Sequence, residues 1–140
     1  MGTIIKYILL LFTVIFFFNC SFISEVPQFS SIEEAQTWVH ENIRYVADID
    51  QYGENDYFAS PKRTLENRAG DCEDMAALLM YICHEQFYTN GSMVKVIRNG
   101  TQHSIAYISG KYYDPVYNDL PSFDKILHIW YYSEIIFLWK

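Results

Sequence analysis

The sequence predicts an α+β domain in which a buried helix packs on an antiparallel sheet. The run from Met75 to Cys83 is apolar nearly all the way round, which is typical of a helix buried on every side. After Ser92, short runs rich in Val, Ile and Tyr are separated by Asn99-Gly100 and Ser109-Gly110. Both dipeptides favour β-hairpin turns. A helical region followed by a strand region indicates an α+β arrangement.

The first helix begins at a capping-box signal, Ser30-Ser31-Ile32-Glu33-Glu34. Apolar residues then recur at helical spacing: Ile32, Ala35, Trp38, Val39 and Ile43. Residues 48–68 contain Gly, Pro and many polar side chains, so we expect mostly loop there, with one turn of helix from Thr64.

Three strands are expected after the buried helix, at Met93–Arg98, Gln102–Ile108 and Lys111–Pro115. The tail from Ile126 to Trp139 is rich in Ile, Trp, Tyr and Phe, and it predicts one or two closing strands. With 140 residues, of which 51% are hydrophobic, the chain can bury one core but hardly two. We therefore expect a single domain over residues 30–140.

The N-terminus predicts export. Lys6 precedes an apolar stretch from Tyr7 to Phe18, which is short for a membrane span and typical of a signal peptide over residues 1–19. Cys20 resembles the lipid-accepting cysteine of bacterial lipoproteins, and residues 20–29 form the expected tether. Ordinary cleavage and an uncleaved anchor are the alternatives to lipidation. Each places the domain outside the cytoplasm, and with lipidation we expect it in the bacterial cell envelope, on the periplasmic or surface side.

The charge balance argues against nucleic-acid binding. The formal net charge is -7, and the sequence contains no cluster of Lys and Arg. Cys72 and Cys83 lie on one predicted helix, about 16 Å apart, which is too far for a disulfide. The same separation argues against a zinc site that combines Cys72, Cys83 and His84.

Cys72 is a candidate nucleophile because it stands where a glycine turn leads into the buried helix. A helix N-terminus supplies partial positive charge and unpaired N–H groups, which favour the reactive thiolate. Asp71, Glu73 and Asp74 oppose thiolate formation through their negative charge. The acids also suit a helix start without any catalysis, so a structural role for Cys72 stays open. A catalytic Cys72 needs a cationic neighbour such as histidine.

Helical spacing and strand position narrow the choice among the four histidines. His84 lies about 18 Å along the same helix from Cys72 and cannot be its base. His40 falls in the first helix and His128 in the closing strand, and neither has an Asp placed to orient it. His103 is the remaining candidate.

The predicted hairpin brings an aspartate to His103. If Ser109-Gly110 forms a two-residue turn, the register pairs Ile105 with Asp114, and His103 lies on the same face as Ile105. Diagonal cross-strand positions lie roughly 7 to 8 Å apart, within reach of two side chains that meet between them. Asp114 can then hold the imidazole while its other nitrogen faces Cys72.

Five segments of the chain match one known family: Asn42-Ile43-Arg44-Tyr45-Val46-Ala47-Asp48, Tyr52-Gly53, Asp56-Tyr57-Phe58-Ala59-Ser60-Pro61, Thr64-Leu65 and Gly70-Asp71-Cys72-Glu73-Asp74. The last block is the most specific. Together these segments resemble the transglutaminase-like superfamily, most closely the bacterial transglutaminase-like cysteine peptidases. Phe58 and Arg63 depart from the family pattern, in which a Trp and a Glu are usual.

The resemblance implies a papain-like core and a Cys-His-Asp triad, which carries over onto Cys72, His103 and Asp114. It implies a thioester acyl-enzyme and a protein or peptide substrate. No cofactor is required by this chemistry, but some related bacterial peptidases use Ca²⁺, for which Asp71 and Glu73 are candidate ligands.

Two functions remain open at this point. The first is an exported cysteine peptidase or amidase, for which hydrolysis and transglutamination would use the same residues. The second is a catalytically silent interaction module that keeps the fold and is anchored to the cell envelope. For either function we expect a monomer attached to the membrane through its N-terminal lipid.

Overall fold

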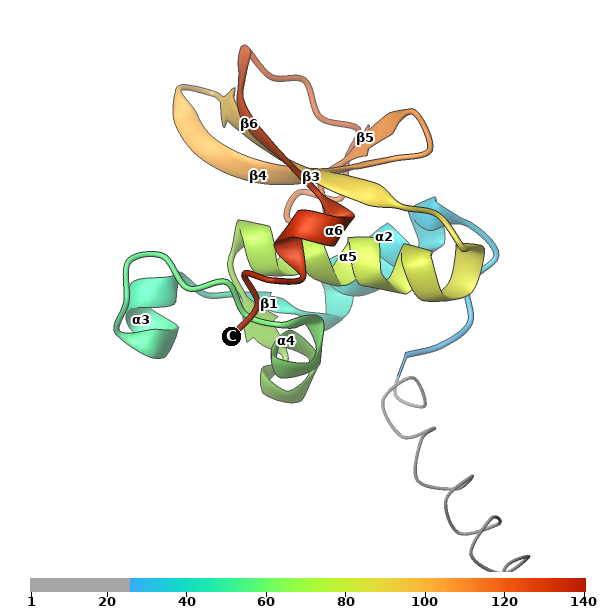
Figure 1. Cartoon of the computed structure of the whole chain (residues 1–140), viewed down its shortest axis with the longest axis horizontal. Coiled ribbons are helices and arrows are strands. Elements are labelled where there is room, and N and C mark those ends of the chain that lie inside the picture. Colours follow the sequence, from blue (N-terminus) through green and yellow to red (C-terminus); the bar gives the residue numbers. More distant parts are fainter. Residues whose placement is uncertain (1–25) are drawn as a thin grey trace, which may run out of the picture.

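A four-stranded antiparallel sheet packs on the long helix α5 (Cys72–Phe87) in the computed structural model, which describes residues 26–140 (Figure 1). The strand order is β5-β4-β3-β6. The strands are β3 (Gly91–Arg98), β4 (Thr101–Ile108), β5 (Lys111–Tyr113) and β6 (Lys125–Tyr131). This arrangement confirms the predicted α+β class with a buried helix on an antiparallel sheet.

The other helices lie mainly on the side of α5 away from the sheet. α2 (Ile32–Asn42) and α4 (Pro61–Asn67) both pack against α5. The short β1 (Arg44–Tyr45) and β2 (Ala69–Gly70) form a separate parallel pair. The remaining helices are the short α3 (Asp48–Tyr52) and α6 (Tyr132–Ile135).

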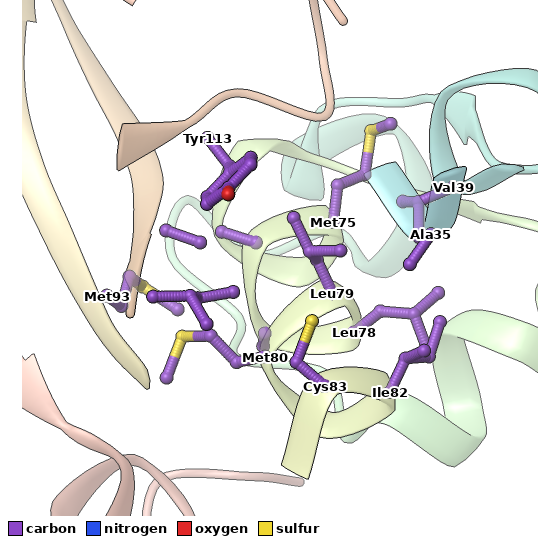
Figure 2. Close-up of a cluster of buried hydrophobic side chains, with 14 of the residues drawn as sticks. Ala35, Val39, Met75, Leu78, Leu79, Met80, Ile82, Cys83, Met93 and Tyr113 are labelled. Carbon is purple, nitrogen blue, oxygen red and sulfur yellow. The ribbon is translucent and has the colours of Figure 1, made fainter. Parts of the chain in front are cut away.

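The core is built around α5, whose residues from Glu73 to Cys83 are buried except for Tyr81. Figure 2 shows Leu78, Leu79 and Cys83 of this helix packed among side chains from α2 and the sheet. Each fully buried large aliphatic side chain contributes about 1.5–3 kcal/mol through removal from water. The predicted helix, buried on all sides, is therefore the central element of the fold.

One sequence expectation is wrong in detail. Residues 48–68 are not mostly loop, because they contain α3 and all of α4. Pro61 occupies the first turn of α4 and the Ser60 side chain accepts a hydrogen bond from Arg63 N, so a strong helix start lies earlier than Thr64. The tail, predicted to form one or two closing strands, contains the single strand β6 followed by α6, in which Glu134 accepts a hydrogen bond from Tyr131 N.

The predicted signal peptide, residues 1–19, and the predicted lipidation site, Cys20, lie outside the described residues. Of the predicted tether, residues 26–29 are described, and Val26 and Phe29 pack against the core. Among residues 26–140, none of the helices combines the length and the apolar character that crossing a membrane requires.

Candidate active site

Cys72 is the first residue of α5 and is held there by a tight turn. Asp71 is the N-cap, and its Oδ1 accepts hydrogen bonds from the N–H groups of Glu73 (3.1 Å) and Asp74 (3.4 Å). Gly70 allows this turn because a Cβ at its position would lie 2.6 Å from the Cβ of Asp74. The nucleophile candidate is thus fixed at the positive end of a rigid, buried helix.

His103 and Asp114 form a buried pair on neighbouring strands. The observed β4–β5 register pairs Ile108 with Lys111 and Ala106 with Tyr113, which is the register that a Ser109-Gly110 turn predicts. His103 Nε2 lies 2.7 Å from Asp114 Oδ2, and the two residues are 9% and 0% exposed. This pairing leaves His103 Nδ1 available for a second partner.

Four donors surround the Asp114 carboxylate. Its Oδ1 accepts from the N–H groups of Val116 (3.0 Å) and Tyr117 (3.3 Å), while its Oδ2 accepts from His103 and from the Arg98 guanidinium. Hydrogen bonds to both oxygens offset the free-energy cost of removing this charge from water. Asp114 is therefore locked in the orientation that contacts His103.

Sequence patterns did not identify Arg98 or its second partner. Arg98 Nη1 lies 3.0 Å from Asp119 Oδ1, and its guanidinium carbon lies 4.5 Å from the centre of the Tyr117 ring. Asp119 is brought back beside Asp114 by a backbone bridge between these two residues. The signal that was available is Arg98 at the end of a strand, directly before Asn99-Gly100. It gives no indication of the turn at 114–119 on which the contact depends.

The Cys72 thiol lies beside the strand that carries His103 but is bonded elsewhere. It is within hydrogen-bonding reach of the Ser104 backbone, the residue next to His103. Its Sγ donates to Glu73 Oε2 at 3.2 Å, and in the part of the chain that the structure describes it makes no hydrogen bond to His103. The structure brings His103 and Asp114 into contact and places Cys72 against Ser104, the residue next to His103.

A cavity of about 420 Å³ opens beside His103. Tyr45 of β1 forms part of its wall, opposite residues that follow β3 and β5 in the chain. Tyr45 is also within electrostatic reach of both Cys72 and Tyr117, although Cys72 is not among the residues that line the cavity. The lining residues are Tyr45, Arg98, Asn99, Thr101, Gln102, His103, Val116 and Tyr117.

The surroundings of Cys72 favour the neutral thiol. Burial raises the pKa of the thiol above its ordinary value, and the charges of Glu73 and Asp71 raise it further. The hydrogen bond with the Ser104 backbone acts in the opposite direction but is the smallest of these effects. The acids that the sequence indicated as unfavourable neighbours therefore act on the thiol in the expected direction.

Buried carboxyl groups are concentrated at the start of α5. Burial and the neighbouring charges of Glu73 and Asp74 raise the pKa of Asp71 to about 9. Burial, together with the charges of Asp48 and Glu73, raises the pKa of Asp74 to about 7. These groups are protonated in the folded protein at pH values where exposed carboxyls are ionised.

The same carboxyl groups fit a divalent cation. Ligand oxygens of Asp48, Asp71 and Asp74 lie within 4.8 Å of one another, as do those of Asp48, Asp56 and Glu73. Asp48 Oδ1 and Asp74 Oδ2 are buried and, within residues 26–140, have no hydrogen-bond partner. An all-oxygen, carboxylate-rich set suits a hard cation such as Ca²⁺. The predicted ligands Asp71 and Glu73 belong to this cluster, whereas Asp48 and Asp74 were not predicted as ligands.

The other cysteine and histidine candidates lie away from Cys72. Cys83 is fully buried in the core and His84 follows it on α5. His40 Nδ1 contacts the backbone carbonyls of residues 115 and 116, and His128 is exposed on β6. In residues 26–140 these side chains form no metal-ligand group with Cys72.

A cysteine at the N-terminus of a buried helix, beside a His-Asp pair on an antiparallel sheet, defines a papain- or transglutaminase-like domain. Residues 21–115 match the family described as transglutaminase-like domain, and the chain belongs to this family. The resemblance found in the sequence is thereby confirmed. Comparison with curated proteins gives no match.

Solved structures share the fold. A candidate cysteine protease from Cytophaga hutchinsonii is 21% identical, with a TM-score of 0.50 over 71% of this chain and 35% of that one. EGTA-treated Legionella pneumophila LapG is 15% identical, with a TM-score of 0.52 over 71% of this chain and 64% of LapG. Calcium-bound LapG is 14% identical, with a TM-score of 0.52 over 73% and 67%. The chain thus spans about a third of the Cytophaga protein and about two thirds of LapG.

Removing the charge of Glu73 should activate the Cys72 thiol. In EGTA at pH 7.5, we expect Glu73→Gln to speed iodoacetamide labelling of Cys72 by about tenfold, because it removes the largest unfavourable charge on the thiolate. Labelling is measured by mass spectrometry of the separate cysteine peptides, with buried Cys83 as the internal control. An unchanged labelling rate at Cys72 would contradict the electrostatic account.

The acidic cluster should make the protein less stable as the pH rises. The folded-state pKa values of Asp71 and Asp74 exceed the unfolded-state values, so the folded protein binds more protons than the unfolded protein does. The free energy of unfolding therefore falls as the pH rises from the unfolded-state to the folded-state pKa values. We expect a loss of at least ~2 kcal/mol from pH 5 to pH 8, measured by urea denaturation in EGTA.

Asp71→Asn tests the source of this pH dependence. The asparagine keeps an oxygen that can cap α5 but no longer titrates, so the variant should lose less stability between pH 5 and pH 8 than the parent protein. Asp50→Asn changes an exposed carboxyl on α3 and should leave the slope unchanged. Equal slopes in the parent protein and Asp71→Asn would refute the assignment.

Proposed function

We propose that this chain is a cysteine peptidase or amidase. The buried His103-Asp114 pair, held by Arg98 beside the helix that begins at Cys72, is the observation that carries the proposal. Membership of the transglutaminase-like family and the fold shared with the candidate cysteine protease support it.

In the proposed reaction, Cys72 Sγ attacks a substrate carbonyl while His103 Nδ1 accepts the thiol proton. Asp114 keeps His103 oriented through the Nε2 contact, and Arg98 positions Asp114. His103 then returns the proton to the leaving amine, which yields a thioester. Water opens the thioester in hydrolysis, and a second amine opens it in transglutamination.

The thiol has to turn from Glu73 towards His103 before it reacts. This turn exchanges an acceptor that raises the pKa of the thiol for a base that removes its proton. We propose that the substrate carbonyl enters from the cavity that His103 lines. A protein or peptide is the proposed substrate.

Two further assignments belong to the same proposal. The sequence supports export, lipidation at Cys20 and a monomer held at the cell envelope. The acidic cluster supports a Ca²⁺ site at Asp48, with Asp71 and Asp74 on one side or Asp56 and Glu73 on the other, and the calcium-bound state of LapG is consistent with it. A bound cation would supply positive charge at the start of α5 and satisfy the buried carboxyl oxygens.

The second candidate function is a catalytically silent interaction module. It is favoured by one observation, the hydrogen bond that holds the neutral Cys72 thiol on Glu73 rather than on His103. Such a module would keep its binding partner when Cys72, His103 and Asp114 are replaced together.

Acyl transfer from p-nitrophenyl acetate distinguishes the two functions. We expect release of p-nitrophenolate together with an acetyl adduct on Cys72, loss of both in Cys72→Ala, and a 10²–10⁴-fold slower reaction in His103→Ala. Cys83→Ala is the matched control and should react like the parent protein. Equal rates for Cys72→Ala and the folded parent protein would reject the peptidase proposal and favour the silent module.

Calcium binding is tested without reference to activity. We expect CaCl₂ to raise the melting temperature relative to EGTA, since a ligand that binds only the folded state stabilises it. The shift should be lost in a variant that combines Asp71→Asn with Glu73→Gln, and retained in Asp50→Asn. A melting temperature that is the same in CaCl₂ and EGTA would argue against the site.

A further inference from the structure

Tyr45 has a fixed position relative to the start of α5. It pairs with Gly70 in the parallel β1–β2 ladder, and Val46 N donates to Gly70 O at 3.0 Å. Gly70 is two residues before Cys72. The backbone of Tyr45 is therefore tied to the segment that carries the nucleophile.

The Tyr45 side chain joins the two halves of the candidate site. It lines the cavity of about 420 Å³ together with His103 and Tyr117, and it lies within electrostatic reach of Cys72. Tyr45 is 53% exposed, so a substrate in the cavity can contact it. In residues 26–140, its phenol O–H makes no hydrogen bond, which leaves one donor unused at the edge of the cavity.

The electrostatic surroundings keep this donor protonated. Partial burial raises the pKa of Tyr45 to about 12, and ionisation of Cys72, Asp71 or Glu73 would act in the same direction. The phenol therefore carries its proton throughout the neutral pH range. A neutral hydroxyl near the thiol can donate a hydrogen bond to a negative charge that forms on the substrate during the reaction and is lost afterwards.

We propose that the Tyr45 hydroxyl donates a hydrogen bond to the oxyanion formed when Cys72 attacks a carbonyl, together with the Cys72 backbone N–H. This inference rests on the proposed function and assigns a catalytic residue to the same site. Phe58, at the position where the family pattern has a Trp, carries no side-chain donor. Tyr45 supplies a hydroxyl from the wall of the cavity, within electrostatic reach of the nucleophile.

The step balances without a further reactant. The Cys72 Sγ–H proton moves to His103, the S–C bond forms, and the carbonyl π electrons move to oxygen, which accepts the hydrogen bond from Tyr45. Collapse of this intermediate restores the carbonyl and breaks the bond to the leaving group. Tyr45 keeps its proton throughout, so it stabilises charge and transfers nothing.

Two probes of the same thiol separate an oxyanion donor from a structural role. Acylation by p-nitrophenyl acetate passes through an oxyanion, whereas alkylation by iodoacetamide displaces iodide at a carbon atom and forms none. Tyr45→Phe keeps the ring and removes the hydroxyl. We expect this variant to slow acylation at least about tenfold and to leave alkylation of Cys72 unchanged.

The controls make each outcome decisive. Tyr107→Phe removes a hydroxyl from a half-exposed tyrosine on β4 outside the cavity and should match the parent protein in both reactions. Equal acylation rates for Tyr45→Phe and the parent protein would overturn the inference, as would an equal slowing of acylation and alkylation. If Cys72→Ala also acylates at the parental rate, the proposed function fails, and the inference fails with it.

Discussion

The burial of α5 on every side is the constraint on which the rest of the structure depends. A helix with apolar residues all round its axis needs a sheet on one side and helices on the other, and the chain supplies both. Because α5 cannot rotate or slide without opening the core, its first residue has one fixed position. Cys72 gains its precision from the packing of Leu78 and Leu79 as much as from its own neighbours.

The way α5 begins sets the chemistry of Cys72 in two opposing ways. Asp71, Glu73 and Asp74 stabilise a helix start, since acidic groups interact favourably with the helix dipole and Asp71 caps unpaired N–H groups. The charges of Asp71 and Glu73 also raise the pKa of the thiol that they flank. The segment that secures the nucleophile therefore also keeps it in its unreactive form. A cation at these carboxyl groups, or movement of the thiol towards His103, would relieve that effect.

The sequence predicted the parts of the site that depend on local rules. A two-residue turn at Ser109-Gly110 is a local event, and it was enough to predict the register that brings His103 to Asp114. Ser60 and Pro61 form a local helix start signal, but the helix from Pro61 was not predicted. The Gly, Pro and polar residues of the segment favour loop, and this composition concealed the signal. Of the one or two strands expected in the tail, β6 is present, and the residues after it form a short helix.

The unpredicted contacts depend on tertiary structure. Arg98 reaches Asp114 and Asp119 only after the turn at 114–119 has folded back, and strand patterns carry no information about that closure. Asp48 and Asp74 lie close together in the structure but far apart in the sequence, and neither helical nor strand periodicity relates positions at that separation. The hairpin that pairs His103 with Asp114 was therefore predictable from the sequence, whereas contacts between separate segments were not.

The site is divided between two scaffolds, and this division limits how it can work. The helix side holds Cys72, while the hairpin side holds His103 and Asp114. The links between them at the thiol are a backbone contact at Ser104 and the side chain of Tyr45 at the cavity.

Since α5 is fixed by the core, any change in the distance from thiol to imidazole must come from the Cys72 side chain or from the end of the β3–β4 hairpin. That hairpin turns at Asn99 and Gly100, both exposed and both at positive φ, so it is the part of the site least restrained by packing. A substrate that fills the cavity would contact this hairpin and Tyr45 together, and binding could thereby align the two halves.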